Sequence, residues 1–310
     1  MSSMRVVYYS KWYSREDVTK ILTRIEDGLV AFLKAGRYKD VLNSMSNLSH
    51  YSLNNQILLL LNNPKTTIVH GVRAWNLLGR RVIEGSKGMA ILAPIIRKSE
   101  NPDDESENGY KLLGYKKAYV FDVSQTTGEP LPSFRFDQKT ILQDKDILIR
   151  GLLRPLEPLG FRLSYHTEKE LGIGVSGRCL HQKKEIHLLE GLSDIETVSV
   201  LAHEAAHALA HQPEKRDFQG ISPKEKRCIK EVEAESIACV VDTYLGLDTS
   251  QMNFSYILAW SEGEMKLFRH NLDTIRTYSQ QLIDGIEAAY KEADKPLESP
   301  RTSYPVPSYS

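Results

Sequence analysis

Residues 201–211 read LAHEAAHALAH, and this short apolar run constrains the chain more than any other segment. On a helix, His203 and His207 stand on the same face, about 6 Å apart along the axis. Two imidazole nitrogens at this spacing can both approach one zinc ion at about 2 Å. Glu204, one residue further round the helix, lies beside the metal and can take a proton from a metal-bound water. The HExxH pattern therefore predicts a zinc site with Glu204 as its catalytic base.

The competing interpretation is a buried helix whose histidines only pack in a core. The surroundings of the run favour the metal, because it follows a predicted strand at 184–188 (KEIHL) and carries alanines at 205, 206, 208 and 210. Such small residues let a second helix approach closely. A catalytic zinc usually takes three protein ligands and keeps one position open, so a neighbouring helix is the natural source of the third.

The third ligand has to come from outside this run. His211 lies about 12 Å from His203 along the helix axis, so it belongs at the surface or behind the ligands. The longer pattern HExxHxxGxxH is excluded, because Ala210 and Pro213 stand where that pattern needs glycine and histidine.

A helix predicted over 224–246 offers better candidates. Apolar residues repeat at helical spacing from Ala234 to Leu245, and this stripe is expected to pack on the HExxH helix. Glu231 and Glu235 border the stripe, where a carboxylate is costly to bury unless it is paired or binds a metal. We predict that Glu231 is the third ligand and that Glu235 accepts a hydrogen bond from a ligand histidine.

Other interpretations of this helix remain open from the residues alone. The roles of Glu231 and Glu235 can be exchanged, and both can be ordinary surface glutamates. Glu233 is expected to point away into solvent. Asp242 shares the face of Glu231 but lies about 16 Å from it, too far to bind the same ion.

Composition and charge set the broad class of the chain. Its 310 residues suggest two domains, and 41% apolar content is ordinary for a globular protein. The net charge of zero hides a split, since residues 1–135 carry 19 basic and 13 acidic residues and 136–310 carry 21 and 27. Three cysteines without a CxxC pair indicate a reducing compartment. With no signal-peptide pattern and no apolar run long enough for a membrane span, we expect a cytoplasmic protein without a membrane partner.

Local patterns predict an α+β protein with two domains. The first half shows helical spacing at 15–35, 51–62 and 72–78, a hairpin pattern at 80–98, and a strand at 116–123. A turn-rich linker at 125–137 separates it from helices at 139–159, 193–212, 224–246 and 262–293, with short strands between the first two. We therefore predict a helix-plus-antiparallel-sheet domain at 1–135, a second domain at 136–295 that carries the predicted zinc site, and a disordered tail at 296–310.

The second half resembles a known group of enzymes. LAHEAAHALAH, followed by KEVEAESIACVVDTYLGLDTS, is similar to ImmA/IrrE-like zinc metallopeptidases and to the peptidase domain of ArdC-type antirestriction proteins. His203, Glu204 and His207 match the first motif of these families, and Glu231 followed by Ala234 matches the second. The resemblance implies that 136–295 is a minimal zincin-like metallopeptidase domain with a gluzincin-like fold. In such a fold a sheet edge holds an extended substrate, and 184–188 is the expected edge strand.

The first half resembles the N-terminal domain of the ArdC-type proteins. The match rests on YSLNNQ at 51–56, the GVRAWNLLGR segment at 71–80, VIEGSKG at 82–88 and YVFDVSQTTG at 119–128. The resemblance implies binding to single-stranded DNA, for which basic groups can follow phosphates and aromatic rings can stack on bases. The residues assigned to DNA are Arg73, Trp75, Arg80, Arg81 and Lys87. The competing interpretation of Trp75 is a core residue, and such a residue is more often core, since its helix also carries Val72, Leu77 and Leu78.

Two hypotheses about function follow. The first is a zinc-dependent endopeptidase that acts on an unknown protein substrate and is coupled to a single-stranded-DNA-binding domain, an antirestriction-like protein of a mobile element. The alternative is a non-catalytic protein that binds and protects single-stranded DNA and carries a structural zinc site.

Overall fold

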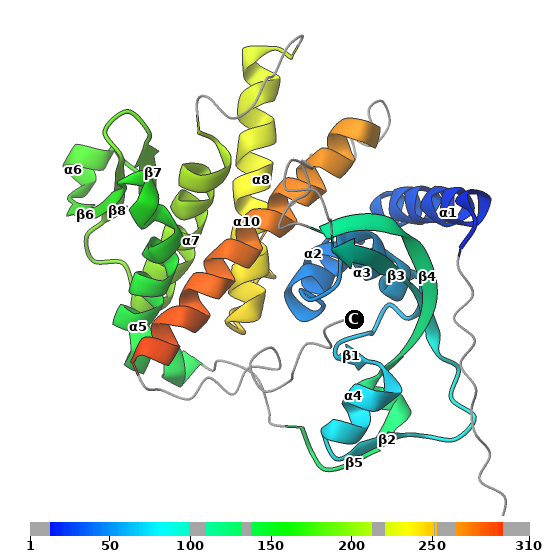
Figure 1. Ribbon diagram of the computed structural model, residues 1–310. Helices are drawn as coiled ribbons and strands as arrows, with labels where there is room; N and C mark the ends of the chain where they lie inside the picture. The colour runs from blue at the N-terminus through cyan, green and yellow to red at the C-terminus, as the bar shows by residue number, and fades with distance from the viewer. Residues whose placement is uncertain are drawn as a thin grey trace, which may run out of the picture. The chain divides into compact units, whose positions relative to one another are not determined.

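A computed structural model describes residues 13–98, 110–131, 138–212, 221–250, 252 and 265–293. The chain forms two compact units (Figure 1). Among the described residues, the first unit is built on 13–32 and 50–131, and the second on 33–49 and on the chain from 138 onward. The predicted tail at 296–310 and the acidic segment at 103–107 lie outside the described residues. No described helix is both long and apolar enough to cross a membrane.

The first unit combines helices with antiparallel strands. Its helices are α1 (Arg15–Lys34), α3 (Leu53–Asn62) and α4 (Val72–Leu77), with a 3-10 turn η2 (Val123–Gln125). Its strands are β1 (Val69–His70), β2 (Arg80–Val82), β3 (Met89–Lys98), β4 (Tyr110–Asp122) and β5 (Thr126–Gly128). One sheet has the order β1-β4-β3, β2 pairs with β5, and the curved β3–β4 ribbon is plain in Figure 1.

The predicted hairpin at 80–98 is wrong. Both strands exist, but β2 pairs with β5 and β3 pairs with β4, so each finds an antiparallel partner further along the chain. Alternation and glycines mark strands and turns in a sequence, but they do not identify the partner of a strand. The open edge of β3 is also occupied, because the Asn55 side chain exchanges two hydrogen bonds of 2.9 Å with the backbone of Leu92.

The second unit is mainly helical. Its helices are α2 (Tyr38–Asn47), α5 (Gln138–Leu153), the 3-10 segment η3 (Arg154–Leu159), α6 (Glu168–Leu171), α7 (Asp194–Ala210), α8 (Pro223–Tyr244) and α10 (Met265–Glu292). Its strands are β6 (Arg162–His166), β7 (Gly177–Leu180) and β8 (Glu185–Leu189). Helix α2 was not predicted from the sequence, and its Tyr38 hydroxyl lies 3.1 Å from the Ser236 hydroxyl of α8.

The three strands form a sheet with the order β6-β8-β7, parallel between β6 and β8 and antiparallel between β7 and β8. The expectation that 184–188 is an edge strand is therefore wrong, since β8 is the central strand. Ile186 and Leu188 are fully buried. Alternation in the sequence indicates which face of a strand is buried, but not how many strands it pairs with.

Side-chain hydrogen bonds cap the first turns of α7 and α8. Ser193 and Glu196 form a capping box at the start of α7, and Ser222 and Glu225 form another at the start of α8. The two helices pack on each other through the alanines of α7 and the predicted apolar stripe of α8, all of which are buried. This contact sets the HExxH residues opposite the glutamates of α8.

A second close contact joins α5 to α10, where Gly151 lies against Gly285 and Ile286. A Cβ atom on Gly151 would lie 2.5 Å from the Ile286 Cα atom. The two helix backbones therefore touch without intervening side chains, which fixes α10 against the rest of the unit.

Candidate metal centre

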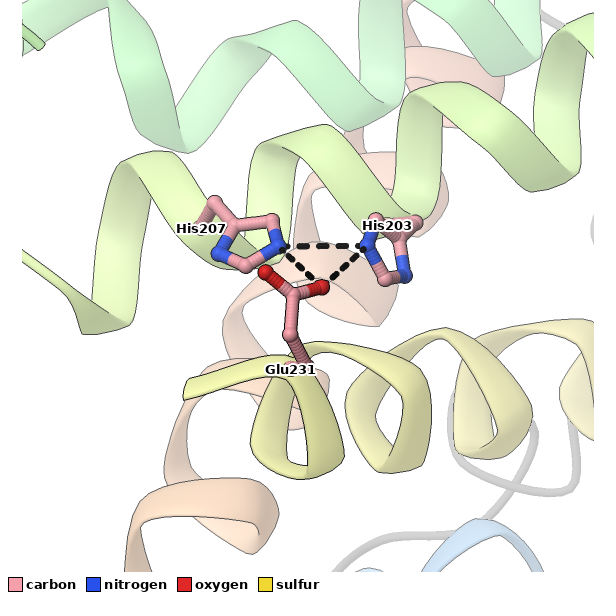
Figure 2. A group of neighbouring side chains, drawn as sticks. All are labelled: His203, His207 and Glu231. Atoms are coloured by element: carbon pink, nitrogen blue, oxygen red, sulfur yellow. Dashed lines mark hydrogen bonds and ion pairs between the residues drawn. The ribbon is translucent and has the colours of Figure 1, made fainter. Parts of the chain in front are cut away.

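Three side chains from two helices converge on one point of the second unit (Figure 2). The Nε2 atoms of His203 and His207 lie 3.1 Å apart, and Glu231 Oε2 lies 3.7 Å and 3.5 Å from them. One ligand atom from each of the three lies within 4.8 Å of the others. Two imidazole nitrogens bound at about 2.05 Å in tetrahedral geometry would be about 3.3 Å apart. This set of two nitrogens and one carboxylate therefore fits a divalent metal ion.

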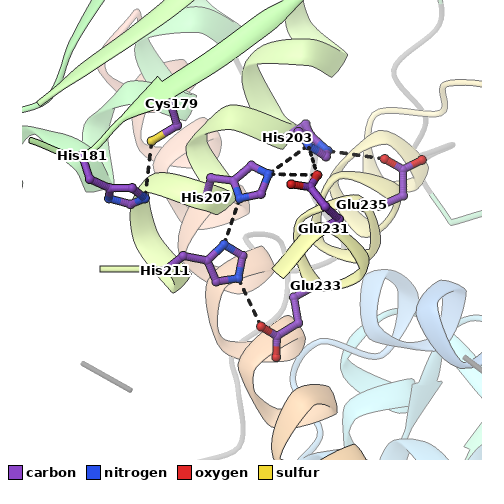
Figure 3. Close-up of polar contacts among 8 residues, drawn as sticks. All are labelled: Cys179, His181, His203, His207, His211, Glu231, Glu233 and Glu235. Atoms are coloured by element: carbon purple, nitrogen blue, oxygen red, sulfur yellow. Dashed lines mark hydrogen bonds and ion pairs between the residues drawn. The ribbon is translucent and has the colours of Figure 1, made fainter. Parts of the chain in front are cut away.

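Glu235 contacts the opposite side of one of these histidines. Glu235 Oε2 lies 3.4 Å from the Nδ1 atom of His203, on the side of the ring away from Glu231 (Figure 3). Burial alone would lower the pKa of His203, but Glu231 and Glu235 outweigh it and raise this pKa to about 9. The hydrogen bonds from His203 and His207 lower the pKa of Glu231. Both shifts arise from the attraction between the imidazoles and the neighbouring carboxylates.

Glu233 does not lie where the sequence placed it, whereas His211 takes the second of its two expected positions, behind His207. Glu233 was expected in solvent, but its side chain is fully buried and its Oε2 atom lies 3.1 Å from His211 Nε2. The expectation failed because α8 contacts helices on several sides, including α2, α7 and α10. The His211 side chain is only 1% exposed, so it is not at the surface, and its Nδ1 atom lies 2.9 Å from His207 Nδ1.

Glu204 occupies the position of the predicted base. Its residue is 7% exposed, and its carboxylate accepts a hydrogen bond from the backbone N–H of Cys179 on β7. Burial raises the pKa of Glu204, although His203 and His207 act in the opposite direction. Gly177 permits this close approach, since a Cβ atom there would lie 2.9 Å from Glu204 Oε1.

A cleft of about 850 Å³ opens onto these groups. Its walls are β7 with the preceding loop, the ligand face of α7, and the first half of α8. The buried Asp242 of α8 accepts a 2.6 Å hydrogen bond from the Ser199 hydroxyl of α7. Ser199 also lines the cleft. Burial raises the pKa of Asp242 to about 7. As expected from its distance, Asp242 is not part of the three-residue ligand cluster.

The residues assigned to DNA fall into two groups. Arg73, Arg81 and Lys87 are exposed in the first unit. Trp75 cannot stack on a base, because it is fully buried and its indole N–H donates to the Phe121 carbonyl at 2.9 Å. Because its neighbours on α4 are apolar, burial in the core was the competing expectation for Trp75. The structure confirms this burial.

Arg80 is also engaged within the fold. Its guanidinium donates to the Thr126 hydroxyl at 2.8 Å and to the carbonyls of Thr126 and Glu129, and so joins β2 to β5. Strand β4 carries an exposed aromatic ring. Tyr119 is 44% exposed, and Lys117 Nζ lies 5.1 Å from the centre of its ring.

Comparison with known proteins addresses the first unit directly. Residues 5–121 match the family model of the N-terminal domain of anti-restriction factor ArdC. The chain is also 23% identical over 322 residues to an uncharacterised protein of Bacillus anthracis, covering 92% of this chain. It spans 52% of the length of that relative.

Two crystal structures of the antirestriction protein ArdC from plasmid R388 are similar to this chain. The Mn(II)-bound structure has a TM-score of 0.50 at 17% identity and covers 87% of this chain and 97% of its own. The metal-free structure has a TM-score of 0.48 at 18% identity and covers 88% and 98%. At this level of identity, the likeness to the Mn(II)-bound structure establishes a common fold and nothing further.

Proposed function

We propose that this chain is an ArdC-like antirestriction protein of a mobile element, and that its second unit is a metal-dependent endopeptidase of the ImmA/IrrE, gluzincin-like type. The observation that carries the proposal is the convergence of His203, His207 and Glu231 in a cleft, with the buried carboxylate of Glu204 beside them. The ArdC match of residues 5–121 supports the antirestriction role.

His203, His207 and Glu231 would hold the metal. When bound, a divalent ion would polarise the scissile carbonyl and make a water molecule acidic. Zinc suits a site of two imidazoles and one carboxylate, and the Mn(II)-bound ArdC structure makes manganese the second candidate. Glu204 takes the proton from the attacking water at its carboxylate and passes it to the leaving nitrogen. Its raised pKa favours the first of these steps, since the carboxylate is then a stronger proton acceptor.

The substrate backbone would lie along β7, which replaces 184–188 as the edge strand. The Ser176 carbonyl accepts from Leu189 N–H of β8, so the alternate residues Gly177 and Cys179 direct their backbone groups away from β8. Cys179 N–H binds Glu204, while Gly177 lines the cleft. An extended peptide that pairs with Gly177 passes directly beside the base and the metal ligands.

The metal site is tested by metal content per chain, measured by atomic emission after loading and desalting. Wild type should hold about one ion, Glu231→Gln should hold little, and Glu235→Gln should hold most of it. Glu204→Gln should keep the metal and lose cleavage of a quenched-fluorescent peptide library. If Glu204→Gln cleaves as wild type does, the endopeptidase is refuted. The protein would then be a DNA-protecting one with a structural metal.

A second function, binding of single-stranded DNA by the first unit, is favoured by its exposed cations and by Tyr119 with Lys117 above its ring. In the full chain, changing Arg73, Arg81 and Lys87 to alanine should weaken oligonucleotide binding and reduce its salt dependence. The slope of log K, where K is the association constant for the oligonucleotide, against log salt concentration is negative. Each lost phosphate contact should reduce the magnitude of this slope by about 0.7. The exposed Lys169 of the second unit supplies the control, Lys169→Ala. Equal slopes in all variants would exclude these residues from the DNA interface.

A further inference from the structure

A continuous line of polar contacts leads from one metal ligand into the core of the second unit. His207 Nδ1 lies 2.9 Å from His211 Nδ1, and His211 Nε2 lies 3.1 Å from Glu233 Oε2 (Figure 3). The side chain of His207 is 15% exposed, that of His211 is 1% exposed, and that of Glu233 is fully buried. Each histidine therefore meets its neighbour away from competing solvent.

The chemistry of the three groups permits one arrangement of protons when His207 binds a metal. A carboxylate can only accept, so Glu233 requires a hydrogen on His211 Nε2. The Nδ1 atom of a neutral His211 then has a lone pair, which requires a hydrogen on His207 Nδ1. This leaves the lone pair of His207 on Nε2, the atom that faces His203 and Glu231.

We propose that His211 and Glu233 are positioning residues that fix the metal-binding tautomer and the ring orientation of His207. The inference rests on the metal site of the proposed function. It gives Glu231, Glu233 and Glu235 of α8 separate tasks. Glu231 faces the metal position, Glu235 contacts His203 directly, and Glu233 reaches His207 through an interposed imidazole.

The burial of Glu233 gains a reason from this arrangement. A fully buried carboxylate is costly unless it is paired, and the hydrogen bond from His211 offsets part of that cost. Positive charge that reaches His207 from a bound ion would be shared along the line of hydrogen bonds toward Glu233. A purely structural His211–Glu233 pair would stabilise the α7–α8 packing without influencing His207.

The test uses the full chain and separates these two roles. His211→Leu removes the acceptor for His207, while His211→Asn keeps an oxygen close to the position of Nδ1. Val240→Ala, at a fully buried position of α8 outside the line, serves as the control for lost stability. Zinc affinity is measured by competition with a chromophoric chelator. The tautomer of His207 is read from long-range ¹⁵N–¹H spectra of the metal-free protein.

We expect His211→Leu to weaken zinc binding about 10- to 100-fold and to place His207 in a mixture of tautomers. His211→Asn should restore most of the affinity, and Val240→Ala should leave both readouts unchanged. Wild-type affinity and a single Nδ1–H tautomer in His211→Leu would overturn the inference. Should His211→Leu fail to fold, Glu233→Met removes the acceptor for His211 Nε2–H. A His207 without the Nδ1–H tautomer in Glu233→Met would support the inference, and wild-type tautomer and affinity there would overturn it. A wild-type protein that binds no metal would instead refute the proposed function.

Discussion

The contact between α5 and α10 gives a stability prediction that can be worked out from the coordinates. In Gly151→Ala, the new Cβ atom would lie 2.5 Å from the Cα atom of Ile286 and 3.0 Å from its nitrogen. Non-bonded carbon atoms prefer about 3.5–4.0 Å, so the helices must move apart by about 1 Å. Both obstructing atoms belong to the backbone, and no change of rotamer can relieve the overlap.

Two opposing effects determine the net change in the free energy of unfolding. Alanine is better than glycine in a helix by up to about 1 kcal/mol. Against this, inserting a group into a close-packed interior costs about 1–3 kcal/mol, and a backbone obstruction belongs at the upper end. Separating the helices also weakens the packing of the buried side chains of Leu148, Leu152 and Leu282. We expect a net destabilisation of about 2 kcal/mol.

The assay is equilibrium unfolding in urea, followed by far-ultraviolet circular dichroism. With a slope of about 2 kcal/mol/M, the midpoint for the second unit should fall by about 1 M. Thr277→Ala places a new alanine at an exposed position of α10 and should change stability by less than about 0.5 kcal/mol. A Gly151→Ala protein as stable as this control would refute the reasoning, because the helices would then separate without loss.

Three further predictions concern the buried groups of each unit. Trp75→Phe should lower stability by about 1–3 kcal/mol, because the Phe121 carbonyl loses its donor, yet leave oligonucleotide affinity unchanged. The pKa of Asp242 is raised from 3.8 to about 7, so its contribution to stability is full below pH 4 and is lost as pH rises through 7. In wild type, the free energy of unfolding should therefore decline by up to about 4 kcal/mol between pH 4 and pH 8, and Asp242→Asn should remove this decline. The measurement is unfolding at pH 4 to 8 with chelator present. Gly177→Ala should reduce peptide cleavage about 10- to 100-fold at unchanged metal content, since its Cβ atom displaces the Glu204 carboxylate.

The spacing of residues within one helix carried most of the information about the site. A four-residue interval placed His203 and His207 together, and the apolar stripe of α8 indicated which glutamates face them. Glu233 was placed wrongly because helical spacing describes a helix with one buried face, whereas α8 is covered on several. The buried line from His207 to Glu233 had one visible signal, the third histidine one turn after the HExxH motif.

The fold was predictable to the extent that local patterns determine it. The helical spacing of apolar residues placed α7 and α8 within a few residues of their ends, since that spacing is a local property of each segment. The partners of β2, β3 and β8 were not predictable, because strand pairing joins segments that are distant in the chain. Helix α2 was missed because it directly follows α1 and has polar residues within its apolar pattern.

The position of α2 early in the sequence affects when the second unit can fold during synthesis. Tyr38 and Ser236 are 198 positions apart, yet both belong to the second unit. At about 5–20 residues per second, α2 leaves the ribosome on the order of 10–40 s before α8 does. Throughout that interval the buried side chains of α2, including Val41, Leu42 and Met45, have no α8 to cover them. The second unit is therefore expected to reach its native packing only late in translation, and α2 is the segment on which a chaperone would act first.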